Sequence, residues 1–331
     1  MFDKITPEMT QLLKASGSSN KRESEPNMIQ LAKALETPLR KGVMSGDITG
    51  GIFMTERLEK GSAPKYPLDF IAPGTEKDYV AYTIPKQGYI PQRAIEGDYV
   101  MVPTYKVGSS IDWNLDYARD ARWPIIARAM QVLMATFVQK SNDDAWHTLL
   151  AAGTDRNIMV FDSAANQGQF TKRLVSLSKT VMVRNGGGNS TSTDRGKLTD
   201  MYLSPEGIED IRDWGVDQVD EITRREIYVA EDGTINRIFG VNLHDLAELG
   251  VGQSYQNFFE NDLGGSLQAN DVELCVGLDL RTNDSFINPV VQDIEVYDDP
   301  ALHREQRAGV YAWREHGWAC LDNRRTVLMS F

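Results

Sequence analysis

The stretch PIIARAMQVLMATFVQKSNDDAWHTLLAAG, from Pro124 to Gly153, decides how the rest of this sequence is interpreted. Its apolar residues recur at the three- and four-residue spacing that places them on one face of a helix. Proline suits the first turn of a helix, where its missing N–H would have no partner in any case. The pattern predicts a helix of about 28 residues, roughly 40 Å long at 1.5 Å per residue. We expect it to be the spine of a domain, with Met130, Leu133 and Phe137 buried against a sheet formed by the end of the chain.

The sequence after this helix predicts an α/β unit. Residues 170–183 have the spacing of a second amphipathic helix, and residues 198–203 have the composition of a strand. Ser204 and Pro205 follow that strand as an N-cap side chain and a first-turn proline, so a helix is expected through Trp214. A strand that leads directly into a helix is typical of a compact α/β domain.

The remaining C-terminal sequence is rich in strands and turns. The run 184–196 has the Gly, Ser, Thr and Asn content of a surface loop. Two runs joined around Asp232 and Gly233, residues 226–230 and 234–241, predict a hairpin. Four further strand-like runs follow, at residues 273–280, 289–297, 307–321 and 326–331. The sequence therefore predicts a mixed α+β protein with a sheet at its C-terminal end.

The sequence before the spine predicts an arm. Residues 5–14 and 27–36 have short helical patterns, separated by a polar run. Residues 42–74 are rich in glycine and proline without clear periodicity, which indicates extended chain. Neither short helix can build a core alone, so we expect this part to lie on another surface.

A long hairpin is expected between the arm and the spine. Residues 77–85 and 98–105 are strand-like and carry large side chains on both faces. A two-stranded hairpin is marginal in water by itself, and apolar residues on both faces need a covering surface. A neighbouring subunit is the expected cover. The predicted subunit-interface residues are Tyr79, Val80, Tyr82, Ile84, Tyr99 and Val100.

Composition restricts the partners. The net charge is −12, which argues against a protein that grips nucleic acid through a basic face. Residues 1–65 hold ten Lys and Arg against eight Asp and Glu, so a slightly basic arm precedes an acidic body. No stretch has the 18 or so apolar residues of a membrane span, and MFDKITPEMT lacks a signal pattern. Two cysteines are too few for a disulfide framework. A cytosolic product without membrane contact is expected.

No constellation of catalytic residues is found. The sequence has no GxSxG, HExxH, CxxC or GxGxxG motif in a suitable context, and its four histidines are scattered. His316 and Cys320 have a spacing that could share a metal, but two ligands do not make a zinc site, so His316 is expected at a surface or interface. The adjacent carboxylates Asp143 and Asp144 are expected at a solvated edge. We therefore assign no catalytic residue, cofactor or metal, and predict that the protein is not an enzyme.

The order of these parts resembles the major capsid proteins of tailed bacteriophages, which have the Hong Kong 97-type fold. The run VYAWREHGWACLDNRRTVLMSF, from Val310 to Phe331, resembles the closing peripheral-domain strands of that family. The resemblance covers nearly the whole chain, although the individual motifs are loose. It implies an N-terminal arm over 1–65, an extended hairpin loop over 66–108, a peripheral domain over 109–168 and 281–331 that contains the spine helix, and an axial domain over 169–280.

The resemblance also implies a function. A member of this family self-assembles as hexamers and pentamers into an icosahedral head that encloses double-stranded DNA without sequence-specific binding. The implied partners are further copies of the chain, a separate scaffolding protein, a portal and a decoration protein. The implied location is the virion, after assembly in the host bacterial cytoplasm. Two alternatives stay open at this point: an encapsulin-like compartment that holds a cargo enzyme, and an unrecognised soluble enzyme.

Overall fold

The computed structural model describes residues 7–18, 20–59, 61–68, 98–120, 122–185, 196–214, 237–268, 271–281 and 284–331. The chain divides into two compact units. Unit 1 consists of Met1–Pro64, Met101–Ala145 and Ile287–Ala319, and unit 2 consists of Lys65–Val100, Trp146–Phe286 and Cys320–Phe331. Both units are therefore built from segments that are distant in sequence.

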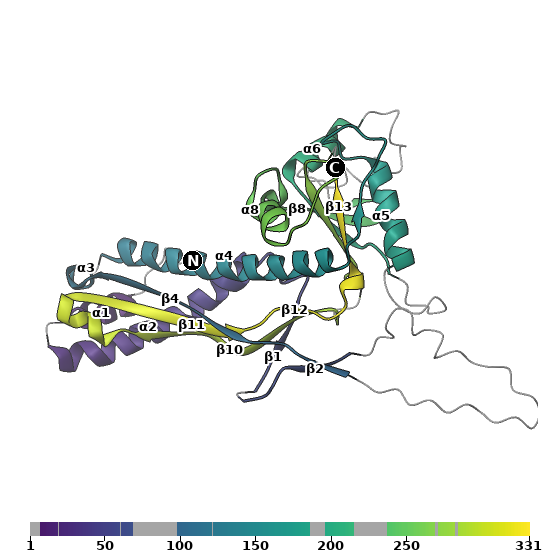
Figure 1. The fold of residues 1–331 in the computed structure, drawn as a ribbon. Coiled ribbons are helices and arrows are strands. Elements are labelled where there is room, and N and C mark those ends of the chain that lie inside the picture. Colours follow the sequence, from purple (N-terminus) through teal and green to yellow (C-terminus); the bar gives the residue numbers. More distant parts are fainter. Residues whose placement is uncertain are drawn as a thin grey trace, which may run out of the picture. The chain divides into compact units, whose positions relative to one another are not determined.

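Unit 1 contains a mixed sheet with strand order β1-β10-β11-β4, and β12 also pairs with β10 (Figure 1). Its strands are β1 (Met54–Arg57), β10 (Phe286–Asp298), β11 (Arg307–His316), β4 (Tyr105–Asn114) and β12 (Ala319–Cys320). Strands β11 and β4 pair antiparallel along their whole length, from Arg307 opposite Asn114 to His316 opposite Tyr105. The helices are α1 (Pro7–Ser16), α2 (Lys21–Gly46), α3 (Leu115–Arg119) and the first part of α4 (Trp123–Asp155).

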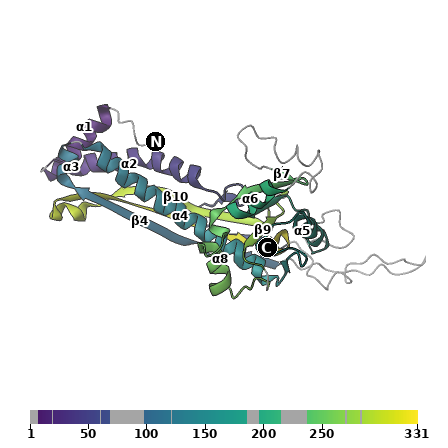
Figure 2. The same ribbon diagram turned by 90° about the horizontal axis from the view of Figure 1, so that it is seen from above.

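Helix α4 confirms the predicted spine, because it is a single helix of 33 residues. Met130, Leu133 and Phe137 are buried, as predicted. They belong to one core cluster with Val296 and Val310 of the sheet and with residues of α2. Figure 2 shows α4 running along strand β4 in this unit. The predicted burial of this stripe against C-terminal strands is therefore confirmed.

The prediction of extended chain over residues 42–74 was wrong for residues 42–46, which are helical. The two short helices predicted from the sequence are α1 and a part of α2, and α2 continues for 26 residues despite Pro26 and Pro38 inside it. The physical reason is packing: Leu31, Leu35 and Leu39 are fully buried in the core of unit 1. Burial of an apolar face outweighs local propensity in most protein helices.

Two glycines that suggested extended chain have a packing role instead. A Cβ atom added to Gly42 of α2 would lie 2.0 Å from Sδ of Met134 on α4, and one added to Gly46 would lie 3.0 Å from Val138. The absence of side chains at these positions lets the two helices approach closely. The glycines are therefore part of the α2–α4 contact.

Unit 2 contains a six-stranded sheet with the order β5-β13-β9-β6-β8-β7. Its strands are β5 (Met159–Val160), β13 (Thr326–Ser330), β9 (Leu274–Leu278), β6 (Asp200–Leu203), β8 (Val241–Asp245) and β7 (Arg237–Ile238). Helices α5 (Lys172–Asn185) and α6 (Pro205–Asp213) contribute to its core, and a short helical region comprises η2 (Ala247–Leu249), α8 (Ser254–Asn257) and η3 (Phe258–Asp262). A separate pair of strands, β2 (Lys65–Leu68) and β3 (Asp98–Met101), forms a two-stranded sheet.

The predicted strand-to-helix junction at Ser204 is confirmed. Its hydroxyl accepts a hydrogen bond from the N–H of Gly207, and Pro205 occupies the first turn of α6. Of the hairpin predicted from residues 226–230 and 234–241, the first run and the turn at Asp232 and Gly233 lie outside the described residues. The second run was wrong as a single strand, because a turn divides it between β7 and β8. The turn lies at Phe239 and Gly240, whose φ angles are 48° and 76°. Two consecutive positive φ angles are characteristic of a tight hairpin turn.

Candidate assembly surface

The predicted interface residues lie partly within the described structure. Tyr79, Val80, Tyr82 and Ile84 fall outside the described residues, as does the loop at 186–195. Tyr99 and Val100 lie on β3, where they are 67% and 36% exposed, and the next residue, Met101, is 62% exposed. Because successive side chains of a strand point to opposite faces, β3 presents apolar surface on both faces. Their role at an interface stays a prediction.

Strand β3 pairs with β2 in a sheet of two strands, the smallest kind of sheet and a marginal one in water. The chain leaving it is fixed in unit 1, where Val102 is buried and its N–H donates to the carbonyl of Pro64 over 3.0 Å. Tyr66 of β2 is buried, whereas β3 exposes apolar side chains that are suited to pack against a second molecule.

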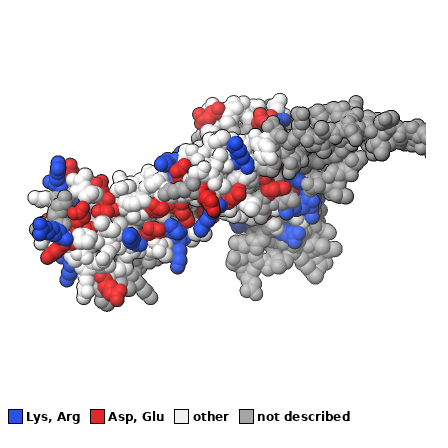
Figure 3. All heavy atoms as spheres, turned by 90° about the horizontal axis from the view of Figure 1, so that it is seen from below, with Lys and Arg blue, Asp and Glu red and all other residues white. Residues whose placement is uncertain are grey.

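A second group of exposed apolar side chains lies in unit 1 between the end of α2 and β1. Its members are Met44, Ile48 and Met54. Scattered exposed apolar residues are normal on any protein, but these three lie within eleven residues of sequence, and Met54 is on the edge strand β1. Figure 3 shows acidic and basic side chains interspersed over the described atoms of one face of the molecule.

Unit 2 is held by a buried ionic cluster that sequence reasoning missed. The carboxylate of Asp279 accepts hydrogen bonds from Arg325 at 2.7 Å, from Arg281 at 2.8 Å and from the backbone N–H of Lys197 at 2.9 Å. Burial opposes the charge of Asp279, but these hydrogen bonds prevail and hold its pKa below the ordinary value. The cluster connects the end of β9 with the start of β13. No sequence signal could have found it, because its members are spread from residue 197 to residue 325.

A second buried carboxyl group has the opposite tendency. Glu273 accepts a short hydrogen bond from the hydroxyl of Ser204, the capping residue of α6. Burial raises the pKa of Glu273, the hydrogen bond from Ser204 lowers it, and the nearby carboxylates of Glu206 and Asp210 raise it. The net result is a pKa of Glu273 above its ordinary value.

The histidines do not gather at a common site in the described structure. His147 stacks on Phe258, with ring centroids 3.7 Å apart, and His244 lies 2.9 Å from Asp200. The prediction that His316 lies at a surface was wrong for this chain on its own, because the residue is buried between aromatic rings. Burial lowers the pKa of His316 to about 3, and the positive charge of Arg314 lowers it too. Among the described residues, no group of three or more metal-ligating side chains is present.

Asp144 does not lie at a solvated edge, as the sequence predicted, but makes specific contacts. Its carboxylate accepts a hydrogen bond from the Tyr105 hydroxyl at 2.7 Å and pairs with Lys140 at 2.8 Å. These contacts fix the start of β4 against α4 in unit 1. Asp144 therefore has a structural role at this point.

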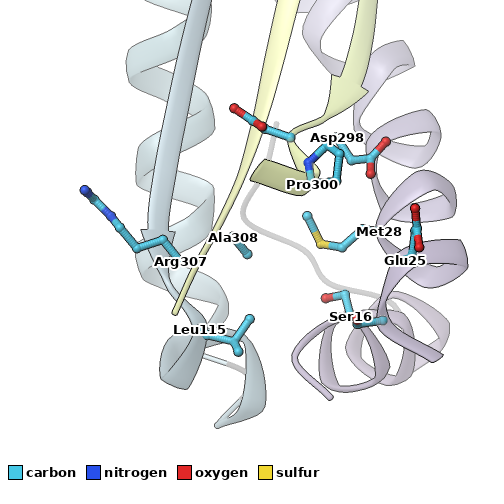
Figure 4. A pocket seen from close by; sticks show the side chains of 10 residues that line it. Ser16, Glu25, Met28, Leu115, Asp298, Pro300, Arg307 and Ala308 are labelled. Carbon is cyan, nitrogen blue, oxygen red and sulfur yellow. The ribbon is translucent and has the colours of Figure 1, made fainter. Parts of the chain in front are cut away.

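A small pocket in unit 1 lies where α1 and α2 meet the strands (Figure 4). Ser16 and Met28 line it from the helical side, and Leu115, Pro300 and Ala308 line it from the other side. Its volume is about 30 Å³, enough for about one water molecule. A substrate would not fit in this pocket.

Within the described ranges, no helix is both long and apolar enough to cross a membrane.

Comparison with known proteins identifies similar structures but no similar sequences. No protein-family model matches the sequence, and no curated protein matches it. A structure from Microbacterium phage Oxtober96 has a TM-score of 0.56 at 8% identity and covers 86% of this chain and 90% of its own. The asymmetric unit of the bacteriophage PhiM1 mature capsid has a TM-score of 0.52 at 11% identity, covering 86% of both chains. The capsid of an empty GTA particle has a TM-score of 0.53 at 10% identity, covering 86% of this chain and 90% of its own. Likenesses at these identities establish the fold.

Proposed function

We propose, from the premise that this chain has the Hong Kong 97-type fold, that it is a major capsid protein of a tailed bacteriophage. The fold itself is the one predicted from the sequence, and the structural neighbours confirm it. In this proposal the chain assembles as hexamers and pentamers into an icosahedral shell around double-stranded DNA. The observation that carries the proposal is the likeness to a mature phage capsid over 86% of both chains.

Two features of the surface support self-assembly. The strand β3 exposes Tyr99, Val100 and Met101 on both of its faces, and a second copy could cover this apolar surface. Among the described residues, the sheet of unit 1 ends in two edge strands, β1 and β4, and edge strands offer backbone groups for further pairing. Identical neighbours in a symmetric shell would bury such surfaces at every copy.

The proposal extends to the partners and the location. A shell of this type needs a scaffolding protein and a portal during assembly in the host cytoplasm, and a decoration protein can bind its outside. DNA would be enclosed without sequence-specific contacts, which agrees with a net charge of −12. We also propose a structural rather than an enzymatic role. The domain division into arm, extended loop, peripheral domain and axial domain belongs to this proposal.

Expression of the full chain in a bacterial host, followed by sedimentation and negative-stain electron microscopy, tests the function. We expect capsomers or closed shells far larger than the 37.1 kDa chain. Nuclease treatment of particles from infected cells separates the alternatives, because a phage head protects DNA and a cargo compartment retains a protein instead. A small monodisperse oligomer at micromolar concentration would contradict the proposal.

A further inference from the structure

Helix α5 carries only positive charges in a chain that is acidic as a whole. Its sequence KRLVSLSKTVMVRN contains four basic residues and no acidic one. Leu174, Val175 and Met182 on one side are buried in the core of unit 2. The charged residues lie on the other side, together with residues that line an open surface hollow: Lys172, Arg173, Ser176, Lys179, Thr180, Val183 and Arg184. We call this surface the basic face.

The basic face has an apolar part with a fixed geometry. Phe239, at the turn between β7 and β8, lines the same hollow and is partly exposed, as is Val183. Phe239 has a φ angle of 48°, which is rare for a residue with a side chain. Nζ of Lys179 donates a hydrogen bond to the backbone carbonyl oxygen of Phe239 over 2.8 Å. The helix thus holds an aromatic side chain beside its cations, a combination that suits protein contacts.

A segment whose only charged residues are acidic lies elsewhere in the same unit. Residues 238–268 contain no lysine or arginine but four carboxylates, those of Asp245, Glu248, Glu260 and Asp262. They follow one another from the end of β8 through η2, α8 and η3. Val251 in this segment is 59% exposed. We call this surface the acidic face.

The two faces lie on opposite sides of unit 2. Figures 1 and 2 both show α5 on one side of the six-stranded sheet and α8 on the other. Strand β8 runs from the basic face to the acidic face. It begins directly after the turn that contains Phe239, and its last residue is Asp245. Two different complementary surfaces on opposite sides of one unit cannot meet within that unit, but they can meet between identical copies. Repetition of such a head-to-tail contact closes into a ring when the rotation permits.

We propose that the basic face of one copy docks on the acidic face of the next copy in a ring of subunits. This inference rests on the proposed function, since it names the contact that would join neighbouring copies within a hexamer or pentamer. Charge complementarity selects the neighbour and fixes the register, while Phe239, Val183 and Val251 supply apolar area at the contact. The occupant of the basic face is a second copy of this chain.

Charge reversal in the full chain tests the contact. One variant combines Lys172→Glu with Arg184→Glu, a second combines Glu248→Lys with Asp262→Lys, and a third carries all four changes. Lys33→Glu with Lys41→Glu, on exposed positions of α2, is a matched control for the change in net charge. Sedimentation velocity and native mass spectrometry measure the fraction of chains in rings and shells.

For each two-residue variant, we expect the fraction of chains in rings to fall at least tenfold. The four-residue variant should regain rings, and the α2 control should assemble normally. Normal rings from either two-residue variant, or a four-residue variant no better than those two, would overturn the contact while the shell function stands. Normal rings combined with loss of DNA from the basic-face variant would assign that face to DNA and also overturn the proposal. A wild-type chain that forms no rings or shells would overturn both this contact and the proposed function.

Discussion

Arg325 and Asp279 form an ion pair in the interior of unit 2, with Nη1 of the arginine 2.7 Å from Oδ2 of the aspartate. Both side chains are removed from water, at 6% and 0% exposure. The pair joins the start of β13, at the very end of the sequence, to the end of β9. A buried pair is worth little relative to two apolar residues, but removal of one partner leaves the other charge buried with weaker compensation.

Replacement of Arg325 by methionine should therefore destabilise the protein strongly. The carboxylate of Asp279 would keep Arg281 and the Lys197 N–H but lose its most buried partner. We expect a loss of about 3 to 5 kcal/mol in the free energy of unfolding, the range for breaking a buried pair. Urea denaturation at pH 7 measures it. Arg304→Met, on an exposed residue, serves as the control and should change little. An Arg325→Met protein as stable as the control would show that the pair is not needed.

The protonation of Glu273 should make stability depend on pH. Its pKa is raised in the folded state, so the protonated form stabilises the fold below the unfolded pKa of about 4.3 and this stability is lost as the pH rises through the folded pKa. Glu273→Gln removes the charge but keeps an oxygen that accepts from Ser204. We expect the variant to have a higher Tm than the wild type at pH 7.5, and the difference to vanish near pH 4.

Calorimetry of both proteins across this range measures the effect. Glu209→Gln on the exposed side of α6 controls for a general loss of acidity. If Glu273→Gln lowers Tm equally at both pH values, the glutamate stabilises the fold through its hydrogen-bond geometry and its charge has no effect on stability. That result would contradict the prediction.

Helix α4 offers a pair of adjacent positions that tests its orientation. Leu133 is 1% exposed in the core of unit 1, whereas its neighbour Val132 is 48% exposed. Leu133→Ala should cost about 2 to 5 kcal/mol, the range for a buried leucine, and reduce the yield of soluble chain. Val132→Ala should change stability by about 0.5 kcal/mol or less. Equal effects from both changes in chemical denaturation would contradict the observed burial.

The contrast between α4 and α2 explains which parts of the fold could be predicted. Helix α4 has a long regular pattern and a first-turn proline, so local signals agree with its tertiary role. Helix α2 contains Pro26, Pro38 and Gly42, which are local signals against a helix. Its leucines are buried in a core that also contains strand residues more than 250 positions away, and no local pattern contains that information.

The same reasoning applies to the sites. The Asp279–Arg325 pair joins residues 46 positions apart, so only the folded chain brings them together. The basic face of α5 could have been found, because a helix sequence with four cations and no anion is visible in the sequence of an otherwise acidic chain. Its significance depends on the position of the acidic face, which follows from the sheet order rather than from the sequence pattern.

The exposed strand β3 gives the sharpest test of whether assembly uses the extended loop. Tyr99 is 67% exposed in the described structure, so most of its side chain lies in water rather than in the core of its own subunit. Tyr99→Ser should therefore leave helix content and Tm nearly unchanged but reduce the fraction of closed shells in sedimentation. The physical reason is the loss of aromatic area that a neighbour would bury, which is worth roughly 1.5 to 3 kcal/mol at each fully buried copy. Ile125→Ser, an exposed apolar position on α4, is the matched control. Normal shells from Tyr99→Ser would show that the neighbours are held elsewhere, and a large drop in Tm would show that the side chain belongs to its own subunit.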